Sequence, residues 1–370
     1  MTSGGASLAS DATALASRSG RSQTSIVTGP ICSRLSGRAA YDASIVADPF
    51  LEWLCSADLT DPSGHCLSWW NRRRPGYAYP EISGLLLTLL ALTGTHSERR
   101  RGLVAALHET PGGSRGIGRF GTDYTFDAGM ALRGLLRSAK SADDRERDLP
   151  ACETFIDAVL DRRATTEAVA VEPDTRWSLS FGAHQAKVAG ALVECLRVDG
   201  LRDRATEALT QLRKDTLALQ DDDGRFRIHG ASSQTYAHSH CYAVEGLLMM
   251  ADAGFGGHDD EIRLGAEWLS TAQAPDGSVR AWHDGVRANG PERLDASAQA
   301  VRIFRIVDGE QFGAEIDAGN AFLRRHVVGD RAVPYEPGSD DLNAWCTMFA
   351  AQALAPATHA AAARSGASLV

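Results

Sequence analysis

The 370-residue sequence lacks the marks of several protein classes. Its apolar run from Leu85 to Leu92 is far shorter than the roughly 20 residues that span a membrane, so no membrane span is expected. It has no Lys/Arg cluster beside aromatic residues on a helical face, and its formal charge is −9, which argues against a nucleic-acid partner. Global disorder is excluded too, because 44% of the residues are hydrophobic. We therefore expect a soluble, mildly acidic globular protein.

The sequence also lacks paired-cysteine motifs. Its seven cysteines are widely spread and none forms a Cys-x-x-Cys pair. An odd number at wide spacing favours reduced thiols in a cytoplasmic enzyme over a disulfide framework. We expect most of them to be small core residues.

Both ends of the chain have a composition that differs from the rest. Residues 1–40 are rich in Ser, Ala, Gly and Thr, and they contain no apolar segment of the kind found in secretory signals. We expect a disordered tail there, with an organelle transit peptide as the alternative. Residues 356–370 are rich in Ala and Ser and are expected to fray. This leaves residues 41–355 as one catalytic domain.

What the sequence does contain is a repeat. Six segments share a turn, an aromatic or polar stretch and an apolar helix with a small residue midway. The small residues recur at intervals of 50, 56, 56, 54 and 50 residues, and they are Gly84, Gly134, Gly190, Gly246, Ala300 and Ala350. A period slightly above fifty is longer than that of the common helical solenoids and suits a helical hairpin with generous loops.

The segments between these helices are amphipathic, whereas the repeated helices are apolar nearly all round. The first kind is typical of outer helices exposed to water and the second of buried inner helices. The amphipathic segments are 44–57, 99–109, 149–163, 202–219, 260–273 and 311–326. Six outer and six inner helices in alternation predict an all-α (α/α)6 toroid whose inner helices ring a central cavity. An open helical repeat array is the alternative, but it would need polar capping repeats.

Polar residues on the apolar inner helices are the candidate catalytic groups, because burying them is costly unless they serve a site. In the fourth repeat His238, Tyr242 and Glu245 lie at i, i+4 and i+7, which is one stripe of a helix. His240 lies two residues from His238 and so points elsewhere unless the helix begins between them. From the other repeats we add Glu81 and Asp295 as catalytic candidates.

A second set of residues is predicted to bind the substrate. The tryptophans and arginine before the first inner helix form an aromatic and basic rim, which suits a sugar ring and an acidic group. The predicted binding residues are Trp69, Trp70, Arg72, Tyr77, Tyr79, Asp127, His184, Lys187, Gln299, Arg302, Asn343 and Trp345. Alternatives stay open for several of them. Asp127, Asp295 and Asn343 could be helix N-caps, His184 could be a core histidine, and the two cations could form structural ion pairs.

Two turns resemble a known family motif. Residues 220–226 (QDDDGRF) and 273–279 (QAPDGSV) are similar to the Gln-x-x-Asp-Gly-x-aromatic repeats of terpenoid cyclases and protein prenyltransferase β-subunits, which are also helical toroids. The segments GYAYPEISGLL, HSHCYAVEGLL, DASAQAVRIF and LNAWCTMFAAQAL further resemble squalene-cyclase-like proteins encoded among polysaccharide-biosynthesis genes. The resemblance spans residues 64 to 355 and implies the fold more strongly than the chemistry.

Several of that family's catalytic features are absent. The sequence has no Asp-x-Asp-Asp acid motif, and the helix that would match the prenyltransferase zinc site reads His240-Cys241-Tyr242 without an Asp. Zinc at His238, His240 and Cys241 would therefore need altered ligands. We expect no metal and no cofactor, and the sequence does not predict an oligomeric state.

Three functions are compatible with these features. The one we favour is a carbohydrate-active enzyme that uses general acid/base chemistry on a sugar or a uronic-acid-containing substrate, as an epimerase, lyase or hydrolase. The second is a terpenoid or prenyl cyclase-like enzyme, which predicts a mostly apolar lumen with one strong acid. The third is a non-catalytic glycan-binding toroid, in which buried His and Glu would have no purpose.

Overall fold

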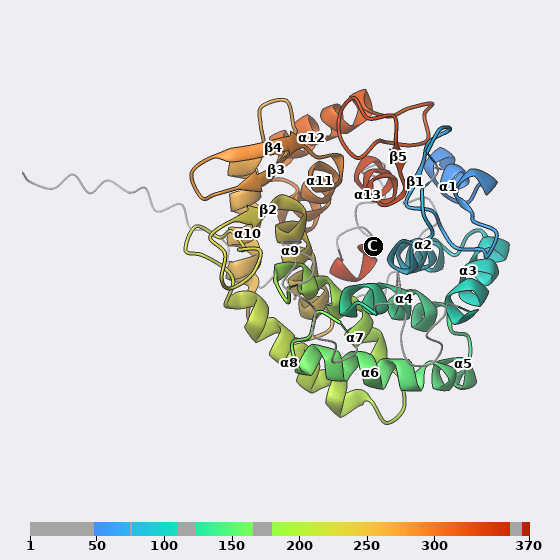
Figure 1. The fold of residues 1–370 in the computed structure, drawn as a ribbon. Coiled ribbons are helices and arrows are strands. Elements are labelled where there is room, and N and C mark those ends of the chain that lie inside the picture. The colour runs from blue at the N-terminus through green and yellow to red at the C-terminus, as the bar shows by residue number, and fades with distance from the viewer. Residues whose placement is uncertain (1–47, 75, 110–122, 166–179, 356–364) are drawn as a thin grey trace, which may run out of the picture.

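A computed structural model describes residues 48–74, 76–109, 123–165, 180–355 and 365–370. The tail expected at residues 1–40 lies outside these ranges. Within them the protein is a ring of paired helices, with the inner helices arranged around the centre and the outer helices behind them (Figure 1). The predicted (α/α)6 toroid is confirmed.

The six inner elements begin close to the predicted segments. They are α2 (Pro80–Thr93), α4 (Thr125–Ser138), η6 (Ala183–Val188) continuing as α7 (Ala189–Cys195), α9 (Ala237–Asp252), α11 (Leu294–Asp308) and α13 (Ala344–Leu354). All residues of α9 from Ala237 to Ala251 are buried, as an inner helix requires. The third inner element departs from a regular α-helix, because its first turns are a 3-10 helix.

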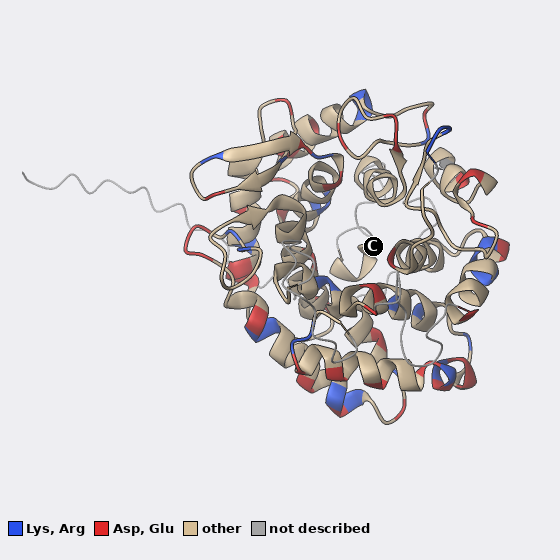
Figure 2. Cartoon of the chain, viewed as in Figure 1, with Lys and Arg blue, Asp and Glu red and all other residues tan. Residues whose placement is uncertain are grey.

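The six outer helices also match their predicted segments. They are α1 (Asp48–Leu54), α3 (Ser97–Glu109), α6 (Leu149–Leu160), α8 (Arg202–Leu217), α10 (Asp259–Ala272) and α12 (Gly313–Arg325), with a short α5 (Ala142–Arg147) before α6. Charged residues concentrate on these outer helices and on the loops, while the inner ring is mostly uncharged (Figure 2). This is the division expected when one helix face packs and the other meets water.

The repeated small residues mark the places where inner helices touch. A Cβ atom added to Gly84 would lie 2.4 Å from the carbonyl oxygen of Met130, and one added to Gly246 would lie 2.2 Å from that of Ala186. Both distances are shorter than any ordinary contact, so only glycine allows this approach of the helix backbones. The repeat therefore reflects close packing of neighbouring inner helices.

The two Gln-x-x-Asp-Gly turns have a structural role. The side-chain nitrogen of Gln220 donates to the carbonyl oxygens of Gly224, at 3.0 Å, and Glu261, at 2.9 Å. Gln273 makes the same pair of bonds, to Gly277 and Glu315. Each turn is thus tied to the following outer helix, which gives the glutamine of each motif a structural role in this chain.

Short strands complete the ring. β1 (Trp69–Trp70) pairs with β5 (Leu342–Asn343) and so joins the first hairpin to the last. β2 (Thr235–Tyr236), β3 (Arg280–His283) and β4 (Ala288–Glu292) form an antiparallel sheet beside the start of α9. The strands therefore lie next to the N-terminal ends of inner helices.

Residues 365–370 correct one expectation. They were expected to fray as part of an Ala/Ser-rich end, but they lie inside the ring (Figure 1), and Leu369 and Val370 are buried. The short helix η8 (Gly366–Ser368) packs against α9. The Ala/Ser-rich composition did not predict this, because Leu369 and Val370 are buried, and the main chain of the segment is hydrogen-bonded, by residues that come together only in the closed toroid.

Candidate active site

A cavity of about 190 Å³ lies at the N-terminal ends of the inner helices. Its twelve described lining residues are Tyr77, Tyr79, Glu81, Tyr124, Phe126, Asp127, His184, Tyr236, His238, Tyr242, Tyr335 and Trp345. Six of the chain's seven tyrosines are among them, and none of the twelve is aliphatic. A wall of phenol rings with two carboxyl groups and two imidazoles offers hydrogen-bonding groups beside flat apolar faces.

The structure brings eight of the predicted site residues to this cavity. They are Tyr77, Tyr79, Glu81, Asp127, His184, His238, Tyr242 and Trp345. Sequence reasoning missed four lining residues, Tyr124, Phe126, Tyr236 and Tyr335. A signal for two of them was present, because Tyr124 and Tyr236 directly precede inner helices just as Tyr79 does.

His238 is oriented by two acceptors on α11. Its Nδ1 lies 2.7 Å from the side-chain oxygen of Gln299 and 3.5 Å from a carboxylate oxygen of Asp295. Because both neighbours accept hydrogen bonds, Nδ1 carries the proton and Nε2 is the ring nitrogen with a free lone pair. The ring packs on Tyr242 with 4.2 Å between centroids. Gln299 and Asp295 do not line the cavity but fix the residue that does.

Asp295 is itself held as an anion. It is fully buried and 3.1 Å from Nη2 of Arg293. Burial alone would raise the pKa of this carboxyl group, but the charge of Arg293, together with a hydrogen bond from the main-chain N–H of Ala296, holds the pKa below its usual value. Arg293 also lies over the ring of Tyr335, 3.0 Å from its centroid. Arg293 is a further residue that the sequence did not single out.

Both cavity histidines are neutral at neutral pH. Burial, with a smaller contribution from the nearby His238, lowers the pKa of His184 to about 3. Burial also lowers the pKa of His238, although the charge of Asp295 opposes the shift. His238 can therefore accept a proton from a ligand, and the imidazolium that forms would face the Asp295 carboxylate.

The two carboxyl groups of the cavity come from neighbouring inner helices. Asp127 is 1% exposed and accepts a hydrogen bond from the hydroxyl of Tyr79 at 3.3 Å. Glu81 is half-buried on the first turn of α2. Burial raises the pKa of Tyr242, and the charge of Glu81 adds to the shift. Among the described residues, the Tyr242 hydroxyl has no hydrogen-bond partner.

His240 does not reach the cavity, which corrects the prediction that it is catalytic. Its Nδ1 accepts from the main-chain N–H of Phe226 at 3.0 Å, and its Nε2 donates to the carbonyl oxygen of Gly265 at 3.1 Å. The ring also packs on Trp268. Both ring nitrogens are used, so His240 joins a turn and an outer helix to α9 and has a structural role.

Glu245 also lies away from the cavity, together with two predicted binding residues. Its carboxylate is 2.6 Å from Nζ of Lys187 and 2.7 Å from Nη2 of Arg302. All three side chains are buried. Seven residues of helix separate Glu245 from His238, which places it about 10 Å deeper along α9. His238 and Tyr242 of the predicted stripe both line the cavity, but Glu245 lies too deep to touch a ligand there.

The predicted rim is mostly structural. Trp69 donates its ring N–H to the carbonyl oxygen of Arg74 and packs edge-on against Tyr77. Trp70 and Asn343 belong to the strands that close the ring, and Asn343 caps α13 by accepting from the N–H of Cys346. Arg72 is exposed and does not line the cavity. The N-cap alternative was the right one for Asn343.

No group of three or more His, Cys, Asp and Glu side chains among the described residues is arranged to hold a metal ion. The sulfur of Cys241, which could have completed a zinc site, faces the carbonyl oxygen of Ala296. All six cysteines in the described ranges are free thiols. Over the same ranges, the longest and most apolar helices fall short of what a bilayer crossing requires.

No protein-family model and no curated protein matches the chain. Several solved structures are similar to the chain in fold. A cellobiose 2-epimerase from Bacillus thermoamylovorans has a TM-score of 0.62 at 10% identity, over 83% of this chain and 95% of the other. A novel α-amylase from Clostridium perfringens has a TM-score of 0.59 at 11% identity, over 86% and 98%.

An inactive α-1,6-mannanase variant of a Salegentibacter species, in complex with α-1,6-mannotriose, has a TM-score of 0.55 at 12% identity, over 87% and 99%. What this chain shares with all three is the toroid fold. At such low sequence identities, a shared fold does not allow functional residues of those proteins to be assigned to positions of this chain.

Proposed function

We propose that the protein is a carbohydrate-active enzyme that works by general acid/base catalysis. The observation that carries the proposal is the geometry of His238, whose protonated Nδ1 is held by Gln299 and Asp295 while the ring lines a cavity walled by tyrosines. A buried, neutral imidazole backed by a carboxylate is the usual arrangement of a proton-transfer group. The three similar structures are of an amylase, an epimerase and a mannanase, which agrees with a carbohydrate substrate.

The reaction we favour begins with proton removal by His238. Nε2 takes a proton from a sugar carbon next to a carbonyl group, as in the open-chain form of a reducing sugar, and the electron pair of the broken C–H bond moves onto the carbonyl oxygen. The charge of Asp295 stabilises the imidazolium that forms. Glu81, at the start of α2, is the candidate group that returns a proton from another wall of the cavity. Return to the opposite face of the same carbon would be epimerisation, and loss of a neighbouring oxygen substituent would be elimination.

Hydrolysis is a second candidate because two carboxyl groups, Glu81 and Asp127, line the cavity. Glycoside hydrolysis needs such a pair on either side of the scissile bond. The other two carboxylates considered from the sequence, Glu245 and Asp295, are occupied by buried cations. The hydrolytic pair is therefore reduced to Glu81 and Asp127.

The lining favours a small, uncharged sugar. None of the twelve described lining residues is Lys or Arg, while two are acidic, so a uronic acid would meet unfavourable charge. The volume of about 190 Å³ is below the roughly 300–1,000 Å³ of pockets for drug-sized ligands, which suits a single sugar unit. The aromatic walls would also suit a terpenoid cyclase, but two imidazoles and two carboxyl groups do not fit a mostly apolar lumen.

Proton NMR in D₂O tests this function. The purified protein is incubated with neutral reducing disaccharides and, in parallel, with uronic-acid oligosaccharides and a prenyl diphosphate. Epimerisation would exchange a ring proton for deuterium, elimination would produce a vinyl proton, and hydrolysis would produce new reducing ends. A His238→Asn variant should abolish the change, while His326→Asn, at the end of an outer helix, should not. No change in any sugar would refute the proposal.

A further inference from the structure

Three neighbouring inner elements carry polar residues in two layers. One layer lines the cavity or lies directly behind its wall, the other lies deeper in the ring, and each element contributes to both. The pairs are His184 and Lys187 on η6, His238 and Glu245 on α9, and Gln299 and Arg302 on α11. The spacing within each pair is three or seven residues, so both members lie on one face of the element.

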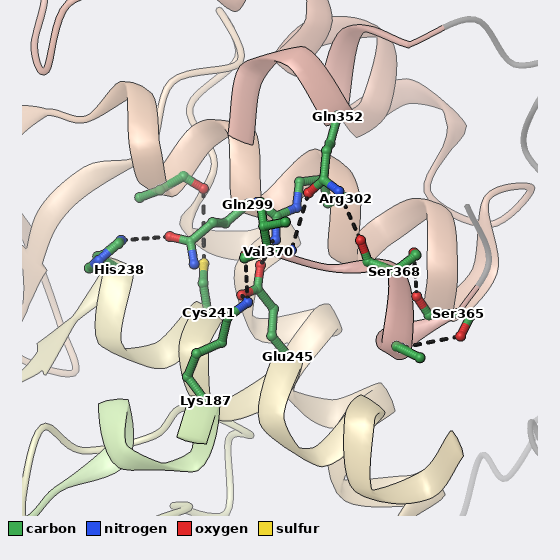
Figure 3. Close-up of polar contacts among 12 residues, drawn as sticks. Lys187, His238, Cys241, Glu245, Gln299, Arg302, Gln352, Ser365, Ser368 and Val370 are labelled. Carbon is green, nitrogen blue, oxygen red and sulfur yellow. Dashed lines mark hydrogen bonds and ion pairs between the residues drawn. The ribbon is translucent and has the colours of Figure 1, made fainter. Parts of the chain in front are cut away.

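The deeper layer is a closed ionic cluster. Glu245 accepts from both Lys187 and Arg302, and the same two cations donate to the carbonyl oxygen of Val370, at 2.6 and 3.0 Å. Figure 3 shows Val370 seated between them. Val370 thus joins η6 to α11, while Glu245 joins both to α9. The same three elements carry the residues that surround the proton-transfer group.

The segment 365–370 is itself fastened at several points. The carboxylate of Asp252, the last residue of α9, accepts from the hydroxyl of Ser365 at 2.5 Å and from the N–H of Ala367 at 2.9 Å. Gln352 on α13 donates to the carbonyl oxygen of Ser368 at 2.8 Å, as Figure 3 shows, and Arg133 on α4 donates to that of Ala367 at 3.2 Å.

The fit of this segment is close. A Cβ atom added to Gly366 would lie 2.5 Å from the main-chain carbon of Leu248 on α9. Leu369 is 3% exposed and Val370 is fully buried. Close packing and many partners mean that the segment cannot shift without moving the helices that it touches.

We propose that residues 365–370 are a positioning element for the active site. They hold η6, α9 and α11 at the spacing at which His238 reaches Gln299 and lies with His184 in the wall of the cavity. Buried charges enforce this, since any separation of the helices would leave Lys187, Glu245 or Arg302 without a partner away from water. The inference rests on the proposed function only for its catalytic consequence, not for the placement of the imidazoles.

Two variants that replace no residue of the cavity or of the ionic cluster test this. Asp252→Asn weakens the hold on Ser365 and Ala367, and Gly366→Leu forces the segment away from Leu248. Asp260→Asn, an exposed residue on α10, is the matched control. Each full-length protein is labelled with ¹⁵N-histidine, and the ring signals and pKa of His238 and His184 are followed by NMR beside kcat and KM.

We expect the ring signals of both histidines to move in the two variants and not in the control, with kcat at least tenfold lower and KM changed less than threefold. Unchanged imidazole signals in the folded variants would overturn the proposal, even if the melting temperature fell. If no substrate is turned over by the wild-type protein, the function is wrong, but the imidazole signals still decide the positioning role. If Gly366→Leu does not fold, the histidine ring signals of Asp252→Asn alone test the positioning role.

Discussion

Nδ1 of His238 lies 2.7 Å from the side-chain oxygen of Gln299, and the two residues belong to consecutive inner helices, α9 and α11. The tautomer of the proposed base is therefore set by a neighbouring hairpin rather than by its own helix. Catalysis would depend on how these two hairpins pack, and the predictions below follow from that dependence.

Replacing the base should abolish catalysis without unfolding the protein. We expect His238→Asn to lower kcat/KM on an identified sugar by about 10²–10⁴-fold, the usual contribution of a positioned proton-transfer group. Circular dichroism and the melting temperature should stay close to wild type, because the side-chain amide of asparagine can keep the hydrogen bond that Nδ1 makes to Gln299. A variant that retains more than a tenth of the activity would exclude His238 as the base.

Asp295→Asn should change the pH dependence of the reaction in a defined direction. The negative charge of Asp295 raises the pKa of His238 against the effect of burial, so its removal lowers that pKa further. The acid limb of kcat/KM should move to lower pH, and kcat on the plateau should fall because the base is weaker. The measurement is a pH–rate profile of both proteins. An acid limb that moves to higher pH would contradict this relationship.

The Tyr242→Phe variant shows whether the hydroxyl of Tyr242 supports the fold or takes part in the reaction. Among the described residues the Tyr242 hydroxyl is buried without a hydrogen-bond partner. A buried hydroxyl without a partner costs stability, so its removal should leave the free energy of unfolding unchanged or raise it by about 1 kcal/mol. Activity should nevertheless fall at least tenfold if the hydroxyl contacts the sugar. Urea unfolding and kcat are measured on the same preparations, and a loss of stability would show that the hydroxyl supports the fold.

Buried neutral histidines should make the protein sensitive to acid. His184 and His240 have folded-state pKa values of about 3 against 6.5 for an ordinary histidine. The unfolded chain takes up these protons first, so stability is complete above about pH 6.5 and falls as the pH drops toward 3. At pH 5 each of the two should cost about 2 kcal/mol. Urea unfolding at pH 7.5 and pH 5.0 measures the loss, and equal stability at both values would contradict it.

The fold was predictable because the residues that repeat along the sequence are the ones that make the contacts between neighbouring helices. Gly84 and Gly246 recur because neighbouring backbones approach them, and Gln220 and Gln273 recur because each ties a turn to the next outer helix. Such residues indicate the fold, and they do so independently of the reaction that the protein catalyses. The end at 365–370 escaped prediction because its partners belong to five different elements and exist only in the closed ring.

The site was predictable only in part, because spacing gives direction around a helix and not depth along it. His238, Tyr242 and Glu245 share a stripe, yet Glu245 lies about two turns below the cavity. His240 is two residues away and faces an outer helix instead. Tyr236 was missed because it lies in β2 before α9, where an aromatic residue is not unusual in the way that a charged residue on an apolar helix is.

The most direct test is a crystal structure of the protein soaked with a neutral disaccharide, with uronic-acid oligosaccharides and a farnesyl diphosphate analogue as parallel soaks. We predict a sugar ring against the tyrosines of the cavity, with one of its atoms about 2.6–3.2 Å from Nε2 of His238. A cavity that takes up the prenyl chain and no sugar, or a sugar bound with His238 out of reach, would contradict the proposed function.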